Sequence, residues 1–142
     1  MKQSQFIGTW KLVYFKNTDE KGIESFPLGE NASGYISYHT DGYMFVVLTK
    51  EHREPFVSND LFGGTETEKA IAYDSFFSYT GKYEIKDQTV IHHIRSCTFP
   101  NWSGTDQIRN FTFAKNSLIL STPPYPVDGS VQVSELRWER VY

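Results

Sequence analysis

Hydrophobic and polar residues alternate over long stretches of the chain, and a period of two is typical of β-strands with one buried face. The longest stretch covers residues 6–15, where one face carries Phe6, Gly8, Trp10, Leu12 and Tyr14. Successive side chains of an extended strand point to opposite sides, so this series shares one side of a sheet. The pattern predicts a long strand over residues 6–15.

A hairpin is predicted around Asp41-Gly42. An Asp-Gly pair supplies the positive backbone φ angles that a tight turn between two strands needs. Strand-like runs flank it at residues 35–39 and 43–49, so we expect these two runs to pair. The preceding residues 16–34 are polar and contain several glycines, which indicates a loop with a short strand near residues 23–26.

One segment carries the signals of a helix. Thr65 and Glu68 form a capping box, in which each side chain accepts a hydrogen bond from the other residue's backbone N–H. Three apolar residues follow at helical spacing: Ala72, Phe76 and Tyr79. We expect one helix that begins at Thr65, ends by Gly81, and lies against a sheet or across a barrel mouth.

After the helix, alternation returns and predicts five more strands at residues 82–85, 89–98, 105–114, 117–122 and 131–141. The total is about eight strands joined mostly by short turns. Many short strands at this spacing indicate a sandwich or a barrel. We therefore expect one all-β domain over residues 1–142.

Composition narrows the classes of function. The net charge is −3 and the basic residues are scattered, so we expect no nucleic-acid partner. The single cysteine, Cys97, excludes an intramolecular disulfide framework. The sequence has no apolar run long enough for a membrane span and begins without the apolar stretch of a signal peptide, which favours a cytoplasmic location. The aromatic content of 16% suits a β-rich core and also a pocket for a flat, apolar molecule.

The two ends of the chain carry a pair of short motifs, Gly8-Thr9-Trp10 and Trp138-Glu139-Arg140. They resemble the lipocalin arrangement, where a G-x-W on the first strand meets a basic residue of the last strand at the closed end of a barrel. The resemblance implies that the Arg140 guanidinium covers the Trp10 indole, a cation–π contact. It also implies that the first and last strands are neighbours.

The whole chain resembles the family of small bacterial and fungal lipocalin-like domains. The similar segments occur in order: Gly8-Thr9-Trp10, Gly34-Tyr35-Ile36-Ser37-Tyr38, Asp41-Gly42-Tyr43-Met44, Tyr79-Thr80-Gly81-Lys82-Tyr83, His92-His93-Ile94, Phe99-Pro100-Asn101-Trp102-Ser103-Gly104-Thr105, Arg109, Leu118-Ile119-Leu120 and Leu136-Arg137-Trp138-Glu139-Arg140. The resemblance implies a closed antiparallel up-and-down β-barrel of about eight strands with one helix. It leaves function open, because one fold hosts many functions.

His92 and His93 are adjacent on a predicted strand, so their side chains point to opposite faces and cannot bind one metal ion from a regular strand. Val90, Ile94 and Ser96 share the row of His92, whereas Arg95 and Cys97 share the row of His93. An unpaired arginine is costly to bury, so we expect the His92 row to face inward. An inward histidine is either a hydrogen-bonded core residue or an acid–base group aimed at a ligand.

Arg109 alternates with Phe111 and Phe113 on one face of its predicted strand. A buried arginine needs a partner, which is an internal carboxylate, an aromatic ring on which it stacks, or a carboxylate of the ligand held by two hydrogen bonds. Trp102 lies in a loop that is suited to capping a pocket mouth. The candidate ligand-binding residues are Tyr38, Tyr43, Phe45, Tyr83, His92, Trp102, Arg109 and Phe111. His92 and Arg109 are also the candidate catalytic residues.

No cofactor or metal is expected. The four histidines are dispersed without the spacing of metal ligands, and the sequence lacks a P-loop, a dinucleotide fingerprint and a nucleophile elbow. The expected partner is therefore a small hydrophobic or aromatic molecule.

Three functions fit these features. The first is binding of such a molecule inside the barrel, as a carrier or a sequestering protein, since a barrel of eight strands holds about one small ligand. The second is a cofactor-free enzyme of the isomerase or cyclase type that uses His92 and Arg109. The third is a structural or partner-binding domain whose barrel is filled by its own side chains.

Overall fold

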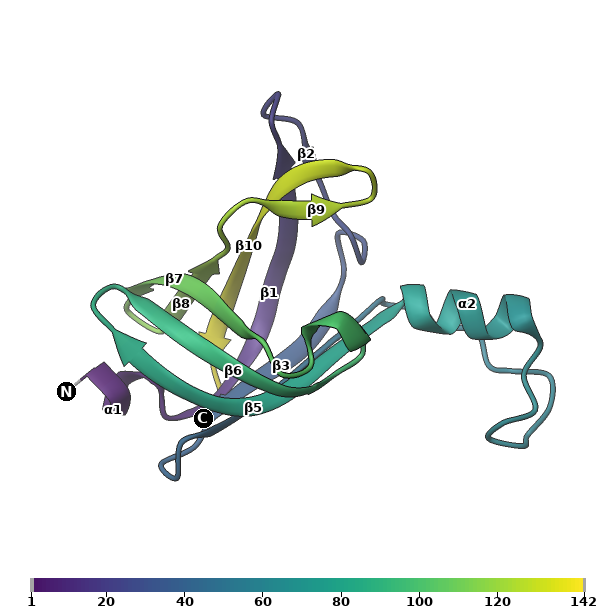
Figure 1. The fold of residues 1–142 in the computed structure, drawn as a ribbon, viewed down its shortest axis with the longest axis horizontal. Coiled ribbons are helices and arrows are strands. Elements are labelled where there is room, and N and C mark those ends of the chain that lie inside the picture. Colours follow the sequence, from purple (N-terminus) through teal and green to yellow (C-terminus); the bar gives the residue numbers. More distant parts are fainter. Residues whose placement is uncertain (1, 142) are drawn as a thin grey trace.

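Eight antiparallel strands close into a ring within residues 2–141, the part of the chain described by the computed structural model (Figure 1). In order around the ring, they are β1 (Gly8–Asp19), β3 (Ser33–Tyr38), β4 (Tyr43–Thr49), β5 (Phe76–Lys86), β6 (Thr89–Cys97), β7 (Asp106–Ala114), β8 (Ser117–Ser121) and β10 (Ser130–Arg140). Each strand pairs with the next, and pairing of β1 with β10 closes the ring. The expected closed up-and-down barrel is confirmed.

The Asp41-Gly42 turn joins β3 to β4 as predicted, with Ser33 opposite Thr49 and Tyr38 opposite Met44. Gly42 has a φ of 89°, a positive value that glycine adopts easily because it has no Cβ. The inner face of β4 consists of Met44, Val46 and Leu48, each at most 4% exposed. Period-two alternation therefore holds along this hairpin.

A short helix, α1 (Lys2–Phe6), closes one end of the barrel (Figure 1). The sequence pattern predicted that the first strand includes Phe6, but β1 begins only at Gly8. Phe6 is still fully buried, because the helix turns its ring into the barrel end against Tyr38 and Phe111, with ring centroids 5.1 and 4.9 Å away. The Trp10 Nε1–H donates to the Phe6 carbonyl at 2.9 Å and fixes α1 to the first strand.

Two irregularities break the alternation of the strands. The pairing of β1 with β10 shifts between Leu12 and Tyr14. The pairing of β5 with β6 shifts between Thr80 and Gly81, opposite Arg95. The second shift corrects the expected inward row: Ser96 is exposed, whereas Cys97 packs against the core, because the extra residue on β6 reverses the faces beyond it.

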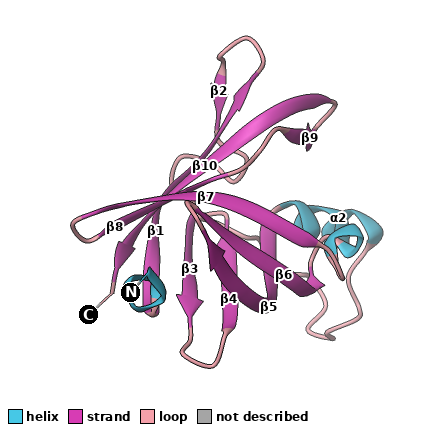
Figure 2. Cartoon of the chain, turned by 60° about the vertical axis from the view of Figure 1, so that its left-hand side comes forward, coloured by secondary structure: helices cyan, strands magenta, loops and turns pink. Residues whose placement is uncertain are grey.

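The end of the barrel opposite α1 is flared (Figure 2). There β1 and β10 extend beyond the other strands and carry the short strands β2 (Glu24–Ser25) and β9 (Tyr125–Val127). Buried polar groups join this extension, because the Ser134 hydroxyl lies 2.5 Å from Asn17 Oδ1 and 2.6 Å from the Tyr125 hydroxyl. We call this flared region the open end.

The predicted helix exists as α2 (Glu66–Asp74), with the expected capping box between Thr65 and Glu68. It ends earlier than expected: the chain leaves it at Ser75, and Phe76 already begins β5. Nor does α2 lie against a sheet or across the mouth. It contains no buried residue and projects from the barrel together with the loop that precedes it (Figure 1).

Candidate functional site

His92 lies in the barrel interior and is 1% exposed. The strand β6 places Val90, His92 and Ile94 on the inner face and His93 on the outer face, as the sequence predicted. His93 lies outside between two carboxylates, with Nδ1 2.7 Å from Asp106 and Nε2 2.8 Å from Glu84. The two histidines therefore occupy different environments.

Both ring nitrogens of His92 are engaged by tyrosines from neighbouring parts of the barrel wall. The Tyr38 hydroxyl lies 2.7 Å from Nε2, and the Tyr79 hydroxyl lies 2.6 Å from Nδ1. A neutral imidazole has one N–H donor and one bare nitrogen, so one tyrosine accepts a hydrogen bond from the ring and the other donates one to it. The three side chains link β3, β5 and β6 through the barrel interior.

Burial keeps this triad uncharged. It lowers the pKa of His92 well below its ordinary value, and the positive charge of Arg109 lowers that pKa further. Burial also raises the pKa of Tyr38 well above its usual range and raises the pKa of Tyr79. At neutral pH the imidazole and both phenols are therefore neutral.

Arg109 comes from β7 and is 7% exposed. Its guanidinium carbon lies 5.5 Å from the centroid of the Trp102 ring, and its Nη1 donates to the Ile108 carbonyl at 3.2 Å. The ion pairs of residues 2–141 involve Lys16, His52 and His93, and none of them includes Arg109. The sequence analysis left several partners open for Arg109. Within residues 2–141, an aromatic ring contacts its guanidinium and no carboxylate forms an ion pair with it.

Trp102 is the centre of a group of aromatic rings at the open end. It lies on η1 (Pro100–Trp102), a single turn of 3₁₀ helix between β6 and β7. Its ring centroid is 5.5–6.3 Å from four others, and we call these five residues the Trp102 cluster: Phe77, Tyr79, Phe99, Trp102 and Tyr125. Tyr79 is buried and the other members are partly exposed, so the cluster presents aromatic surface at the mouth.

The structure brings together three of the predicted site residues: His92, Trp102 and Arg109. Tyr38 joins them through its contact with His92. Tyr83 and Phe111 are also inside, but they lie toward the α1 end, where Phe111 packs on Phe6 and the Tyr83 hydroxyl donates to the His39 carbonyl at 2.9 Å.

Tyr43 and Phe45 do not face the interior, which corrects the expectation for these two residues. They are 43% and 49% exposed, because the pleat of β4 directs Met44, Val46 and Leu48 inward. Sequence reasoning left Phe77, Phe99 and Tyr125 out of the site. It considered Tyr79 as a possible lining residue but placed it on the helix. The alternating stretch Phe77-Ser78-Tyr79-Thr80-Gly81 was the available signal for a strand.

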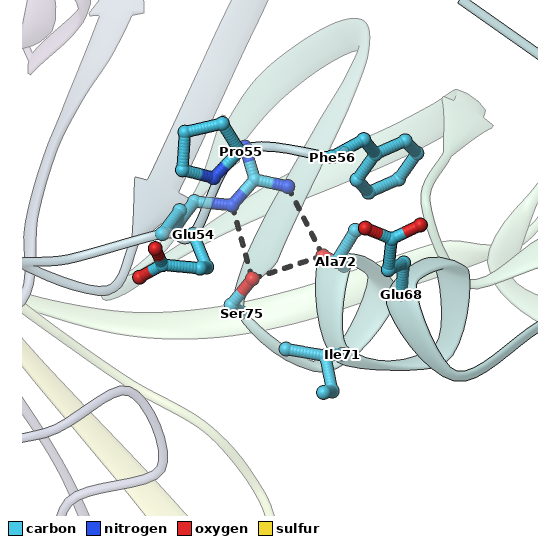
Figure 3. Close-up of a pocket in the computed structure, with 8 residues that line it drawn as sticks. Glu54, Pro55, Phe56, Glu68, Ile71, Ala72 and Ser75 are labelled. Carbon is cyan, nitrogen blue, oxygen red and sulfur yellow. Dashed lines mark hydrogen bonds between the residues drawn. The ribbon is translucent and has the colours of Figure 1, made fainter. Parts of the chain in front are cut away.

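Two hollows lie outside the barrel. One, of about 500 Å³, lies between α2 and the loop before it and is bordered by Phe56 and Ile71 (Figure 3). There Arg53 donates to the Ser75 hydroxyl and the Ala72 carbonyl at the end of α2. The other, of about 520 Å³, lies at the turn between β7 and β8 beside Arg140. Neither is lined by His92, Trp102 or Arg109.

The described residues contain no group of three or more His, Cys, Asp or Glu side chains placed to hold a metal ion. No helix among residues 2–141 is long and apolar enough to cross a membrane.

Comparison with known proteins identifies the family. The model of the lipocalin-like domain family matches residues 7–141, and the chain belongs to that family. A relative in Aspergillus oryzae, the 4'-hydroxy-3'-methoxypropiophenone carrier protein, is 31% identical over 91 residues, which cover 58% of this chain and 82% of that protein.

Among solved structures, a lipocalin-like protein from Bacteroides uniformis aligns with 96% of this chain and 98% of its own, with a TM-score of 0.50 and 12% identity. At that identity the similarity concerns the fold alone.

Proposed function

We propose that this protein binds and carries a small aromatic molecule at the open end of its barrel. The observation that carries the proposal is the Trp102 cluster, a group of partly exposed rings above the buried Arg109. Aromatic rings attract flat apolar molecules through burial and through offset or edge-to-face contacts. Loop residues such as Trp102 also adjust more easily than strand residues, so its ring can shift to admit a ligand.

The chemical class follows from the same groups. The rings supply apolar contact, while the Arg109 guanidinium and the Tyr79 hydroxyl supply polar contacts that fix orientation. A hydroxyaryl ketone combines a flat ring with two oxygens, and the fungal relative is named for such a compound. We therefore take 4'-hydroxy-3'-methoxypropiophenone as the first candidate ligand.

The arrangement of side chains inside the barrel fits a ligand carrier better than an enzyme. A general base needs a free lone pair within reach of the substrate proton. Both ring nitrogens of His92 are already engaged by Tyr38 and Tyr79, and burial disfavours its protonated form. His92 is thus placed to hold the barrel wall together. A cofactor-free isomerase or cyclase reaction requires this triad to open.

The test is a titration of the protein with the hydroxyaryl ketone, followed by tryptophan fluorescence and by calorimetry. We expect saturable binding of one molecule per chain, recovered unchanged after incubation. Trp102→Ala should weaken it by about tenfold or more, since an aromatic contact of this kind contributes roughly 1 kcal/mol beyond the area it buries. Phe45→Ser, a substitution of an exposed aromatic on the outer face, is the matched control and should leave affinity unchanged.

Three other outcomes oppose the proposal. Failure of the ketone and of other aromatic probes to bind supports a barrel filled by its own side chains. Equal loss of affinity in Trp102→Ala and Phe45→Ser places the ligand elsewhere. Chemical conversion of the ketone, abolished by His92→Ala, supports the enzyme.

A further inference from the structure

Arg109 brings a positive charge into the barrel, and none of the ion pairs among residues 2–141 includes it. The side chain is 7% exposed, and it contacts the Trp102 ring, the Ile108 carbonyl and the Tyr79 hydroxyl, all of which are uncharged. An isolated buried charge is strongly unfavourable, and natural proteins keep such a charge where a partner or a ligand compensates it. The Trp102 ring compensates only part of it, because a cation–π contact is weaker than a paired carboxylate.

The surrounding titratable groups do not supply the missing charge. Burial raises the pKa values of Tyr38, Tyr79 and Cys97, so the two phenols and the thiol stay protonated at neutral pH. His92 is neutral as well. Arg109 acts electrostatically on all four of these groups, and none of them carries a negative charge that could pair with its guanidinium.

We infer that the ligand binds as an anion, with an ionised oxygen acid on its aromatic ring paired to Arg109. This inference rests on the proposed function and adds the charge state of the ligand. An acyl phenol is a suitable acid, because the acyl group withdraws electrons from the ring and stabilises the phenolate. On binding, its O–H bond breaks, the electron pair stays on the oxygen facing Arg109, and the proton passes to the buffer.

The position of the Arg109 guanidinium beside Trp102 suits it to this role, since its central carbon lies 5.5 Å from the ring centroid. A guanidinium is planar and carries five N–H donors; Nη1 donates to the Ile108 carbonyl, and the N–H groups on its remaining edge can donate to an anionic oxygen. Paired hydrogen bonds between this edge and an anionic oxygen are among the strongest that side chains make. The ring of the ligand then lies beside the Trp102 cluster, and one contact region serves both the aromatic and the charged parts of the molecule.

The experiment compares an acyl phenol with its methyl ether, which has the same ring and ketone but cannot ionise. We expect wild-type protein at neutral pH to bind the phenol at least about tenfold more tightly than the ether, since a charge-assisted hydrogen bond amounts to about one to two powers of ten in affinity. The bound phenol should show the long-wavelength absorption band of a phenolate. An independent pair of probes, anilinonaphthalene sulfonate and uncharged phenylnaphthylamine, should show the same preference for the anion.

Substitutions at Arg109 form the second part of the experiment. Arg109→Gln should remove the preference and the phenolate band while the methyl ether still binds, and ether binding itself shows that the variant is folded. Arg109→Lys keeps the charge and should keep part of the preference. Arg137→Gln removes a cation outside the site, whose Nη2 donates to the Ser117 hydroxyl, and should change neither affinity.

The two proposals fail in different ways. Equal affinities for phenol and ether, and for the charged and uncharged probes, overturn the inference and leave an uncharged-ligand carrier in place. A phenolate band that persists in Arg109→Gln also overturns it. Failure of all four compounds to bind overturns the proposed function and the inference together.

Discussion

The Arg140 guanidinium carbon lies 4.1 Å from the centroid of the Trp10 ring, at the point where the first and last barrel strands pair. Two further contacts orient it, because Nη1 donates to the Ile7 carbonyl at 2.8 Å and Nη2 to the Gln5 carbonyl at 2.6 Å. Arg140 thus joins β10, β1 and the chain around α1. Gly8 belongs to the same arrangement: its φ is 123°, and a Cβ there would lie 3.1 Å from Arg140 Nη1.

Replacing Arg140 should weaken barrel closure. We expect Arg140→Ala to lower the free energy of unfolding by about 2 kcal/mol, the sum of a cation–π contact and lost hydrogen bonds to backbone carbonyls. Urea unfolding followed by tryptophan fluorescence measures the change. Arg140→Lys keeps the charge without the planar fork and should lose less. A stability of Arg140→Ala equal to that of the wild type would contradict this role.

The triad of His92, Tyr38 and Tyr79 should stabilise the fold as a unit. Tyr79→Phe leaves Nδ1 of the buried His92 without its partner, which we expect to cost about 1–3 kcal/mol. Tyr38→Phe should do the same at Nε2. In the His92→Phe variant, each tyrosine substitution should lower the free energy of unfolding by less, because the ring nitrogen that the tyrosine contacts is absent. Tyr35→Phe, on the exposed outer face, is the control. Additive losses in the double variants would show that the contacts act independently.

The pH dependence of stability should carry the signature of His92. Its pKa is lowered in the folded protein, so the unfolded chain binds more protons below the ordinary histidine pKa of about 6.5. Stability is therefore complete above that pH and falls as the pH is lowered toward 5. His92→Gln should remove this fall. Urea midpoints at several pH values between about 5 and 8 measure the effect.

His93 has the opposite effect on the pH dependence of stability. Hydrogen bonding to Asp106 is the main cause that raises its pKa, so its contribution is present below the unfolded pKa and is lost as the pH rises through the folded value. Its side chain is 36% exposed, so the effect should be the smaller of the two. His93→Gln should therefore steepen the net fall of stability toward acid pH. The pH range from about 7 to about 5 spans the ordinary histidine pKa. A wild-type protein that becomes more stable as the pH falls through this range would contradict the larger contribution of His92.

The strands of the barrel could be predicted because most of them have one buried face. In β4 and most of β6 the burial alternates as the sequence pattern indicated. The G-x-W motif and Arg140 pointed to the closing pair through a family resemblance, and the structure shows their contact. What the pattern could not show was the bulge at Arg95, because one extra residue in a strand leaves no signature in its composition.

The end of α2 was mispredicted because two periods overlap in the sequence. Ala72, Phe76 and Tyr79 fit a helix, whereas Phe77, Tyr79 and Gly81 fit a strand. Tertiary pairing decided the outcome: residues 76–82 pair with β4, and a strand in a closed ring gains hydrogen bonds on both edges. The helix has no buried face, so nothing in the barrel favoured its extension.

The candidate site was only partly readable for a similar reason. Arg109 and His92 stood out because charged or polar residues in an inward row need an explanation. Tyr43 and Phe45 were misplaced because an aromatic residue fits either face of a strand, and the outer face of β3 and β4 carries several: Tyr35, Tyr43 and Phe45. Tyr125 was missed because it follows two prolines in a segment that predicted no strand.

The three tryptophans allow the most direct test of where a ligand binds. Trp102 lies at the open end, whereas Trp10 is hydrogen-bonded to α1 and Trp138 lies on β10 opposite Leu12, and both are 1% exposed. The measurement is the NMR spectrum of the three indole N–H groups during titration with the hydroxyaryl ketone, with assignment by Trp102→Phe. We expect the Trp102 signal to shift saturably while the Trp10 signal stays in place. An unchanged Trp102 signal, with shifts confined to the hollow beside Phe56 and Ile71, would contradict binding at the barrel mouth.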